Sequence, residues 1–315
     1  MTGRAAVLVT SRSFGGGAED PAATLAAHGL EVARGPADHD PEALAPLLAG
    51  AVAWIAGSGP VTDDHLRAAP RLRIVARYGT GVDAVDLDAA RRREVVVTNT
   101  PGVNASAVAE HTVALMLACL RQVVDADRQV RAGRWPSMRG RELGAATVGL
   151  VGLGAVGRRV AGLVAGFGST VLAHDPAVAG AADAGDVEMV ALERVWVRAD
   201  VISLHCPPAP RPLVDRPALA RMRRGTVIVN TARAGLLDEG AVADALHADD
   251  LGALGADVLG GDDRSPSPLR DAPRTVLTPH CAAQTVEAVD RMGRAAVDEV
   301  VRVVAQDRPP RHRVA

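Results

Sequence analysis

The chain has 315 residues, 48% of them hydrophobic, which is enough to bury the core of one large domain or of two medium-sized ones. Its formal net charge of -2 and its 2% aromatic content are atypical of nucleic-acid-binding proteins, which usually present a basic face or stacking rings. No apolar stretch approaches the ~20 residues that span a bilayer. We therefore expect neither a nucleic-acid partner nor a membrane partner.

The cysteines Cys119, Cys206 and Cys281 have neither the spacing of a metal site nor the density of a disulfide scaffold. The first apolar run, Ala5–Val9, is too short for the core of a signal peptide. These features favour a reducing, cytoplasmic location, and no metal site is predicted.

Short apolar segments alternate with stretches of helical periodicity along the whole chain. Many of the segments are rich in valine and isoleucine and apolar throughout, as in parallel strands that are buried on both faces. The alternation predicts a doubly wound α/β architecture. Helical spacing is found in Pro41–Leu48, Ala155–Ala165 and Glu239–Leu246. The expected strands are Ala5–Val9, Val52–Ala56, Arg73–Arg77, Val95–Thr98, Thr147–Val151, Thr170–His174, Asp200–His205, Thr226–Asn230, Gly255–Val258 and Thr275–Thr278.

The longest helical pattern runs from about Ala105 to Ala132 and separates the first group of strands from the second. Its broad apolar surface is equally consistent with two interpretations: a link between two domains that offers a dimer surface, or plain core packing. The tail that begins at Arg308 is expected to be a frayed terminus.

A glycine-rich turn follows the strand Thr147–Val151, and a helix follows the turn. Gly152 permits the tight turn, Gly154 lets a pyrophosphate approach the backbone, and Gly157 lets helix and strand pack closely. Asp175 follows the next strand, where an acid binds the ribose diol and repels a 2′-phosphate. We predict a dinucleotide site that favours NAD over NADP, although Arg158 and Arg159 near the turn leave NADP open.

Three later strand ends carry polar side chains. They place Arg233, the loop that contains Asp262, and His280 at the edge of a sheet where α/β proteins bind ligands. Alone, these residues could be a surface charge, a loop cap and a satisfied imidazole. Together they suit the reduction of a 2-keto acid: an arginine binds the carboxylate, a histidine protonates the alkoxide, and a carboxylate orients the histidine.

The chain resembles the D-isomer-specific 2-hydroxyacid dehydrogenases over nearly its whole length. The motifs that carry the resemblance are Arg77-Tyr-Gly-Thr-Gly-Val-Asp83, Asn99-Thr-Pro-Gly-Val-Asn104, Ala109-Glu-His-Thr-Val, the glycine turn, Ser203-Leu-His-Cys-Pro, Val229-Asn-Thr-Ala-Arg-Ala-Gly235 and Thr278-Pro-His280. The resemblance implies two Rossmann-like domains, with an NAD-binding domain of residues 100–285 inserted into a substrate domain of residues 1–99 plus 286–315. It also implies hinges near Asn99–Gly102 and His280–Thr285, and a homodimer that pairs through the cofactor domain and the long helix.

The resemblance also assigns roles to single residues. His280 matches the acid/base histidine and Arg233 the substrate-binding arginine. The remaining implied cofactor residues are Gly152, Gly154, Ala155, Val156, Gly157, Asp175, Cys206, Pro207, Thr231 and Asp257. The turn Thr80-Gly81-Val82 matches backbone N–H groups that bind the substrate carboxylate, and Ser58 and Tyr78 are further pocket candidates.

The family places a glutamate five residues after the strand-end aspartate, and this sequence has Asp262 there. We expect Asp262 to be the partner of His280, with Asp263 as the second choice. Because aspartate is one methylene shorter, the loop must come closer or a water must bridge; otherwise activity is weak.

The implied activity is the NAD-dependent interconversion of a 2-keto acid and a D-2-hydroxy acid. A phosphoglycerate dehydrogenase is the main alternative, but where such enzymes carry an arginine followed by serine this chain has Gly57-Ser58. A phosphite dehydrogenase is disfavoured because the Gly79–Asp83 loop has no lysine. A non-catalytic NAD-binding co-repressor and a degenerate NAD binder remain as alternatives, and short tails count against the co-repressor. Oxidation of Cys206 and Cys281 near the cofactor is a further hypothesis; two inert thiols are the simpler interpretation.

Overall fold

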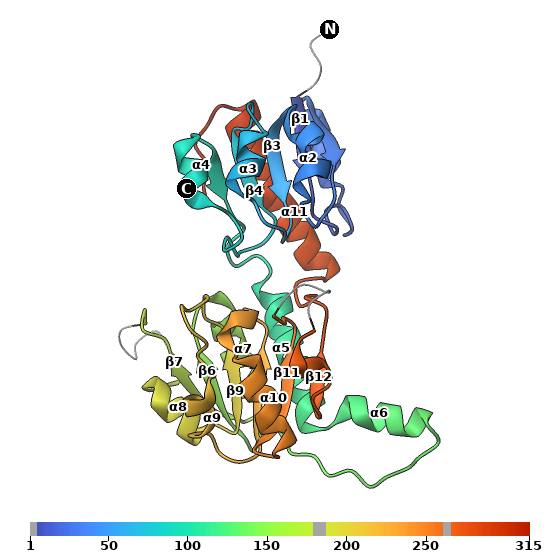
Figure 1. Cartoon of the computed structure of the whole chain (residues 1–315), viewed down its shortest axis with the longest axis vertical. Coiled ribbons are helices and arrows are strands. Elements are labelled where there is room, and N and C mark those ends of the chain that lie inside the picture. Colours follow the sequence, from blue (N-terminus) through green and yellow to red (C-terminus); the bar gives the residue numbers. More distant parts are fainter. Residues whose placement is uncertain (1–4, 179–186, 261–265) are drawn as a thin grey trace. The chain divides into compact units, whose positions relative to one another are not determined.

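The computed structural model describes residues 5–178, 187–260 and 266–315, and Figure 1 labels many of its helices and strands. The chain divides into two compact units. The first comprises Met1–Asn104 and Ala283–Ala315, and the second comprises Ala105–Ala282. The division expected from the sequence, with residues 100–285 as the inserted domain, stays a prediction at the level of its boundaries.

The first unit is built on a five-stranded parallel sheet in the order β2-β1-β3-β4-β5. Its strands are β1 (Ala5–Val9), β2 (Leu30–Arg34), β3 (Ala51–Ala56), β4 (Ile74–Arg77) and β5 (Val96–Thr98). Its helices are α1 (Pro21–Ala27), α2 (Pro41–Leu48), α3 (Asp63–Arg67), α4 (Leu87–Arg92) and α11 (Val286–Val300), which continues into the π-helical turn η4 (Val301–Ala305).

Both faces of this sheet are covered. Leu25 of α1 and Val289 of α11 belong to the hydrophobic cluster on one face, and Leu44 of α2 and Leu66 of α3 belong to the cluster on the other. Every residue of the central strands β3 and β4 is buried, as expected for strands packed on both sides.

The C-terminal tail differs from the expectation of a frayed end. The backbone N–H of Val97 in β5 donates to the carbonyl of Ala315, at 2.9 Å, and Val314 donates back to Val97. Glu299 of α11 is 2% exposed and accepts the backbone N–H groups of Arg311 and His312. The tail is therefore fixed along the edge strand of the first unit.

The second unit is built on a seven-stranded parallel sheet in the order β12-β11-β10-β9-β6-β7-β8. Its strands are β6 (Thr147–Val151), β7 (Thr170–His174), β8 (Glu188–Met189), β9 (Val201–Leu204), β10 (Thr226–Asn230), β11 (Leu251–Ala256) and β12 (Thr275–Leu277). Its helical segments are α5 (Ala105–Leu120), α6 (Val123–Arg131), α7 (Ala155–Gly166), α8 (Leu192–Arg198), α9 (Arg216–Leu219), α10 (Glu239–His247) and the short η2 (Ala234–Leu236) and η3 (Pro268–Arg270).

Helices cover both faces of this sheet as well. Met116 of α5 and Val160 of α7 belong to one buried cluster, and Trp196 of α8 and Leu246 of α10 belong to the other. Both units thus have the doubly wound, Rossmann-like architecture that the sequence predicts.

The expected long helix is wrong in one respect, because it is two helices. Helices α5 and α6 meet at a bend of 60°, where Gln122 adopts a left-handed conformation with φ of 53° that interrupts the helix. Within the described residues, no single helix has the length and apolarity to cross a membrane; α5 and α6 meet that criterion only if they are counted together.

Candidate functional site

The glycine turn after β6 has the geometry that a nucleotide-binding turn requires. Gly152 has φ of +101°, and a Cβ atom there would lie 2.5 Å from the carbonyl oxygen of His205. A Cβ at Gly157 would lie 2.2 Å from the carbonyl oxygen of Gly152. A Cβ at Gly154 would meet nothing within 4 Å, so the space above this residue is open to a ligand. The fold therefore requires glycine at positions 152 and 157, and Gly154 leaves room for a ligand.

Helix α7 begins directly after this turn with an uncapped N-terminus. Gly154 is its N-cap and offers no side chain to the first N–H groups, which belong to Ala155, Val156 and Gly157. By contrast, Asp238 caps α10 by accepting the N–H of Ala241. An uncapped helix start combines free N–H groups with a partial positive charge, and it therefore fits a dinucleotide pyrophosphate.

Asp175, at the end of β7, is tied to the same turn. One carboxylate oxygen accepts the N–H of Leu153 at 2.7 Å, and the other accepts the N–H of Ala177 at 2.9 Å. Arg159 donates to the side chain of Ser106 and to the carbonyl of Ala155, so this cation is engaged within the unit. The arrangement places a negative charge beside the glycine turn, and the binding of a ribose by Asp175 stays a prediction.

The end of β9 lies against the glycine turn through the carbonyl of His205. Burial lowers the pKa of His205 to about 4, and Ser203 lies within hydrogen-bonding distance of its Nε2, at 2.9 Å. Cys206 and Pro207 follow, half-buried and exposed respectively. Burial raises the pKa of the Cys206 thiol, which disfavours the reactive thiolate that the oxidation hypothesis needs.

Arg233 follows β10 on a turn that the side chain of Asn230 organises. The amide of Asn230 accepts the N–H of Ala232 and donates to the carbonyl of Arg233, at 3.0 and 2.8 Å. Thr231 lies 2.9 Å from Thr112 of α5, oxygen to oxygen. Arg233 itself is half-buried.

Asp257, after β11, is 1% exposed and fully engaged by the next loop. Its carboxylate accepts the hydroxyl of Thr278 at 2.5 Å and the N–H groups of Cys281 and Ala282, both at 2.9 Å. These residues flank His280. The buried carboxylate therefore fixes the turn that carries the histidine, and a contact between Asp257 and the cofactor stays a prediction.

His280 is exposed and has φ of 53°, so its turn is held in a left-handed conformation by these bonds. Its imidazole makes no hydrogen bond to another residue of the described ranges. Asp262 and Asp263, its expected partners, lie outside the described residues.

His111 of α5 is a residue that the sequence analysis did not single out. Its Nε2 lies 2.9 Å from the hydroxyl of Thr278 and 3.6 Å from Asp257. Together with Cys281 these groups form a His–Asp–Cys cluster whose potential ligand atoms lie within 4.8 Å of one another. Burial raises the pKa of the Cys281 thiol most, and the negative charge of Asp257 raises it further. The only signal in the sequence was the Glu-His-Thr motif, which gives no indication that α5 meets the end of β12.

In the first unit, Thr80, Gly81 and Val82 form a turn after β4. Arg77 donates to the carbonyl of Gly81 at 3.0 Å, and Asn99 donates to the carbonyl of Thr80 at 2.8 Å. Among the described residues, no hydrogen bond is made by the three backbone N–H groups of the turn. The carbonyls of Thr80 and Gly81 are thus hydrogen-bonded, whereas the N–H groups of the turn are free. Free backbone N–H groups of this kind can bind a carboxylate.

The other two pocket candidates of the first unit differ. Ser58 is exposed at the end of β3. Tyr78 is 8% exposed, its hydroxyl donates to the carbonyl of Val289 at 2.9 Å, and burial raises its pKa to about 12. The ring also contacts Phe14 edge to face, which makes Tyr78 a core residue in this geometry.

Comparison with known proteins gives a consistent set of relatives. The family model described as "D-isomer specific 2-hydroxyacid dehydrogenase, NAD binding domain" matches residues 113–282. The D-3-phosphoglycerate dehydrogenase of Mycobacterium tuberculosis is 45% identical over 246 residues, covering 76% of this chain and 46% of that protein. The hydroxypyruvate reductase of Thermotoga maritima is 37% identical over 247 residues, covering 76% of this chain and 80% of that protein.

A crystal structure of a Thermus thermophilus protein superposes with a TM-score of 0.88 at 34% identity, covering 98% of this chain and all of that one. The chain spans about half the length of the phosphoglycerate dehydrogenases that it matches, at 46% of the Mycobacterium protein.

Proposed function

Because the chain belongs to the D-isomer-specific 2-hydroxyacid dehydrogenase family, we propose that it interconverts a 2-keto acid and a D-2-hydroxy acid with NAD. One observation carries the proposal. The turn of Gly152, the turn of Arg233 and the turn of His280 all follow strands of one parallel sheet. They therefore share the edge at which such sheets bind their ligands.

The cofactor residues of the proposal belong to the second unit, the NAD-binding domain of the family. The open space at Gly154 and the free helix N-terminus at Ala155 and Val156 suit the pyrophosphate. Asp175 holds the ribose diol, and Cys206, Pro207, Thr231 and Asp257 line the nicotinamide side. When bound, the nicotinamide supplies or accepts the hydride; the rest of the chemistry belongs to the chain.

The proposed chemical step has three protein parts. The guanidinium of Arg233 binds the substrate carboxylate and polarises the carbonyl. In the first unit, the free N–H groups of Thr80–Val82 are the proposed binding group for a substrate carboxylate. His280 donates a proton to the oxygen that becomes a hydroxyl, and it takes this proton back in the reverse direction. Asp262 supports the imidazole in the proposal.

The first experiment measures NADH oxidation with glyoxylate, hydroxypyruvate, pyruvate, phenylpyruvate and 3-phosphohydroxypyruvate, with NADPH in parallel. Turnover that is lost in Arg233→Ala supports the site. Bound NADH without oxidation on any substrate would favour the non-catalytic NAD binder instead.

Phosphoglycerate dehydrogenase activity is the second candidate, and the names of the 44–45% identical relatives favour it. Gly57 stands where the resemblance to such enzymes implies a phosphate-binding arginine. A preference for 3-phosphohydroxypyruvate over hydroxypyruvate would support this candidate. Another cationic side chain would then have to bind the phosphate in place of residue 57.

We also propose a cytoplasmic homodimer. Helix α6 has no buried residue, and Val123 and Val130 are 52% and 46% exposed, with Trp135 at 87% shortly after it. A large exposed apolar surface of this kind is typical of an interface. Light scattering that gives a monomer would contradict the dimer.

A further inference from the structure

The first unit has its own topological switch point. In the order β2-β1-β3-β4-β5 the chain moves outward on one side of β1 and then returns to β3 on the other. Crevices outside such a point, at the carboxyl ends of the strands, are the usual ligand sites of open α/β sheets. Two segments meet there: Thr10–Gly17 after β1 and Gly57–Thr62 after β3.

A buried hydrogen-bond network joins these two segments. The hydroxyl of Thr10 accepts the indole N–H of Trp54 at 3.0 Å and the N–H of Gly57 at 3.2 Å. Its own proton is therefore donated to Nε2 of His39, at 2.7 Å. The second ring nitrogen of His39 then carries a proton and donates to the carbonyl of Pro60, at 2.9 Å.

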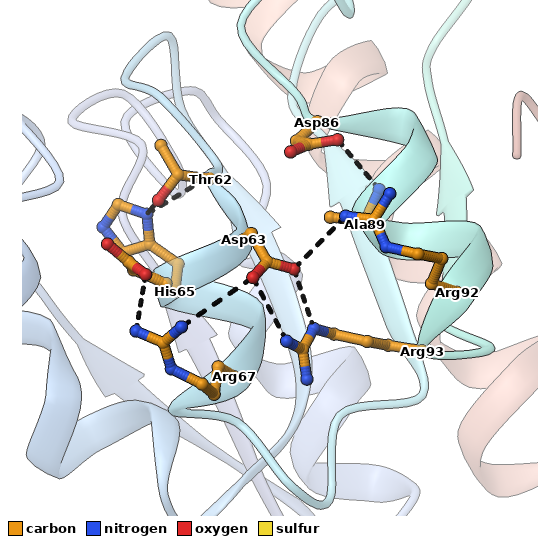
Figure 2. Close-up of polar contacts among 9 residues, drawn as sticks. Thr62, Asp63, His65, Arg67, Asp86, Ala89, Arg92 and Arg93 are labelled. Atoms are coloured by element: carbon orange, nitrogen blue, oxygen red, sulfur yellow. Dashed lines mark hydrogen bonds and ion pairs between the residues drawn. The ribbon is translucent and has the colours of Figure 1, made fainter.

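The second histidine of this network, His65, fixes the far end of the segment after β3. The N–H and hydroxyl of Thr62 contact its Nδ1, and its Nε2 donates to the carbonyl of His39 at 2.9 Å. Figure 2 shows Thr62 beside His65 at the start of α3. It also shows Asp63 facing Arg92 of α4 and Arg93, which caps the end of α4 and lies 3.1 Å from Asp63. Both histidines are 1% exposed. The segment is thus held at Gly57, Pro60 and Thr62.

The close approach of the segment after β1 to the segment after β3 leaves no room for a side chain at residue 57. A Cβ on Gly57 would lie 2.8 Å from the carbonyl oxygen of Thr10 and 3.2 Å from the Cα of Ser11. The backbones of Ser11 and Gly57 therefore touch, and the residues that follow them are Arg12 and Ser58. Both of these residues are exposed.

Arg12 is the one cation of the two segments Thr10–Gly17 and Gly57–Thr62. Within the described ranges of the chain its guanidinium forms no hydrogen bond and no ion pair. A free guanidinium suits a phosphate or carboxylate, because it can donate two parallel hydrogen bonds. The exposed Ser58 follows the glycine whose backbone Ser11 touches, so it is a second polar group on the neighbouring segment.

We propose that Arg12 and Ser58 bind a second anionic group of the substrate, in addition to the carboxylate that the N–H groups of Thr80–Val82 bind. The inference rests on the proposed function and names its substrate class: 2-keto acids with a phosphate ester or a second carboxylate. The free N–H groups of Thr80–Val82 follow β4, two strand positions from β1, or about 10 Å at the usual strand spacing. One sheet edge can therefore bind both ends of a short dianionic acid.

The test compares Arg12→Gln with Arg71→Gln, an exposed arginine that precedes β4 at the opposite edge of the sheet. Two substrate pairs are used: 3-phosphohydroxypyruvate with hydroxypyruvate, and 2-oxoglutarate with 2-oxobutyrate. We expect Arg12→Gln to lower kcat/KM roughly 10- to 100-fold for the dianionic member of the preferred pair and less than about twofold for its monoanionic partner. Arg71→Gln should change neither, and Arg12→Lys should retain part of the preference. The two pairs distinguish a phosphate ligand from a carboxylate.

Equal loss on both members of a pair, or no loss on either, would overturn the proposal. If no substrate is turned over, the proposed function fails and calorimetry decides the binding site separately. In that case 3-phosphoglycerate should bind the wild-type protein more tightly than Arg12→Gln, and equal or absent binding to both would overturn the anion site.

Discussion

The topological switch point of the second unit is formed by backbone groups, whereas that of the first unit depends on buried side chains. Between β6 and β9, the second unit presents backbone: glycines that lack side chains and a helix that lacks a cap. Between β1 and β3, the first unit presents loops that buried side chains of Thr10, His39 and Trp54 hold in place. A backbone site suits a ligand that is always the same dinucleotide. In the first unit, buried side chains fix the backbone of the loops. The exposed positions 12 and 58 can therefore carry side chains that suit a particular substrate without disturbing the loops.

The largest expected effect tests whether chemistry belongs to the second unit. His280→Asn should lower kcat roughly 100- to 10,000-fold, because a general acid contributes this much, and should leave the NADH dissociation constant unchanged. Steady-state kinetics and NADH fluorescence measure the two quantities. The control is His247→Asn, an exposed histidine at the end of α10. An active His280→Asn variant would remove the proposed acid/base role.

The next effect tests how firmly the first switch point is held. Thr10→Val keeps the shape but leaves the N–H groups of Trp54 and Gly57 without their acceptor. The free energy of unfolding should fall by about 2–6 kcal/mol, since two buried N–H groups lose their acceptor and each unsatisfied group costs ~1–3 kcal/mol. Urea denaturation measures it, with exposed Thr170→Val as the control. A loss no larger than that of the control would mean that the network is weak.

A smaller effect sharpens the assignment of the second switch point to NAD. Asp175→Ser removes the negative charge beside the glycine turn, so the ratio of kcat/KM for NADH to that for NADPH should fall roughly 10- to 100-fold. Asp271→Ser removes an exposed acid before β12 and should leave this ratio unchanged. If both variants behave alike, Asp175 does not select the cofactor.

The smallest effect concerns pH. Burial lowers the pKa of His39 to about 4, below the 6.5 of an unfolded histidine. The unfolded chain therefore binds the proton more readily, and the stability that neutral His39 provides is complete above pH 6.5 and declines towards pH 4. His39→Gln should be less stable than wild type at neutral pH, and the difference should shrink as the pH falls. Denaturation at several pH values measures the difference; a constant difference would contradict the assignment.

Local sequence signals predicted the parts of the structure that local physics determines. The strands Thr147–Val151 and Thr226–Asn230 and the helix Pro41–Leu48 were predicted with the bounds that the structure has. Strand β2 was missed because it is a half-exposed edge strand with charged residues at its second and last positions. Strand β11 begins at Leu251, before the expected Gly255, because its glycines weaken the strand pattern.

The candidate site divides in the same way. The glycine turn is a continuous motif, and its dihedral angles and close contacts follow from its own residues. The support of His280 is a tertiary feature, because His111 and Thr278 are separated by 167 positions. The bond between Thr10 and His39 joins residues 29 positions apart in different βα units. Residues that meet only after the sheet has formed leave no periodic signal in the sequence.

The stereochemistry of one reaction product tests the central claim most directly. Wild-type protein is mixed with NADH and hydroxypyruvate, the nicotinamide absorbance is followed to completion, and the product is separated on a chiral column. We expect one D-glycerate for each NADH oxidised. L-glycerate, a racemate, or bound NADH that none of the 2-keto acids oxidises would contradict the proposed D-specific hydride transfer.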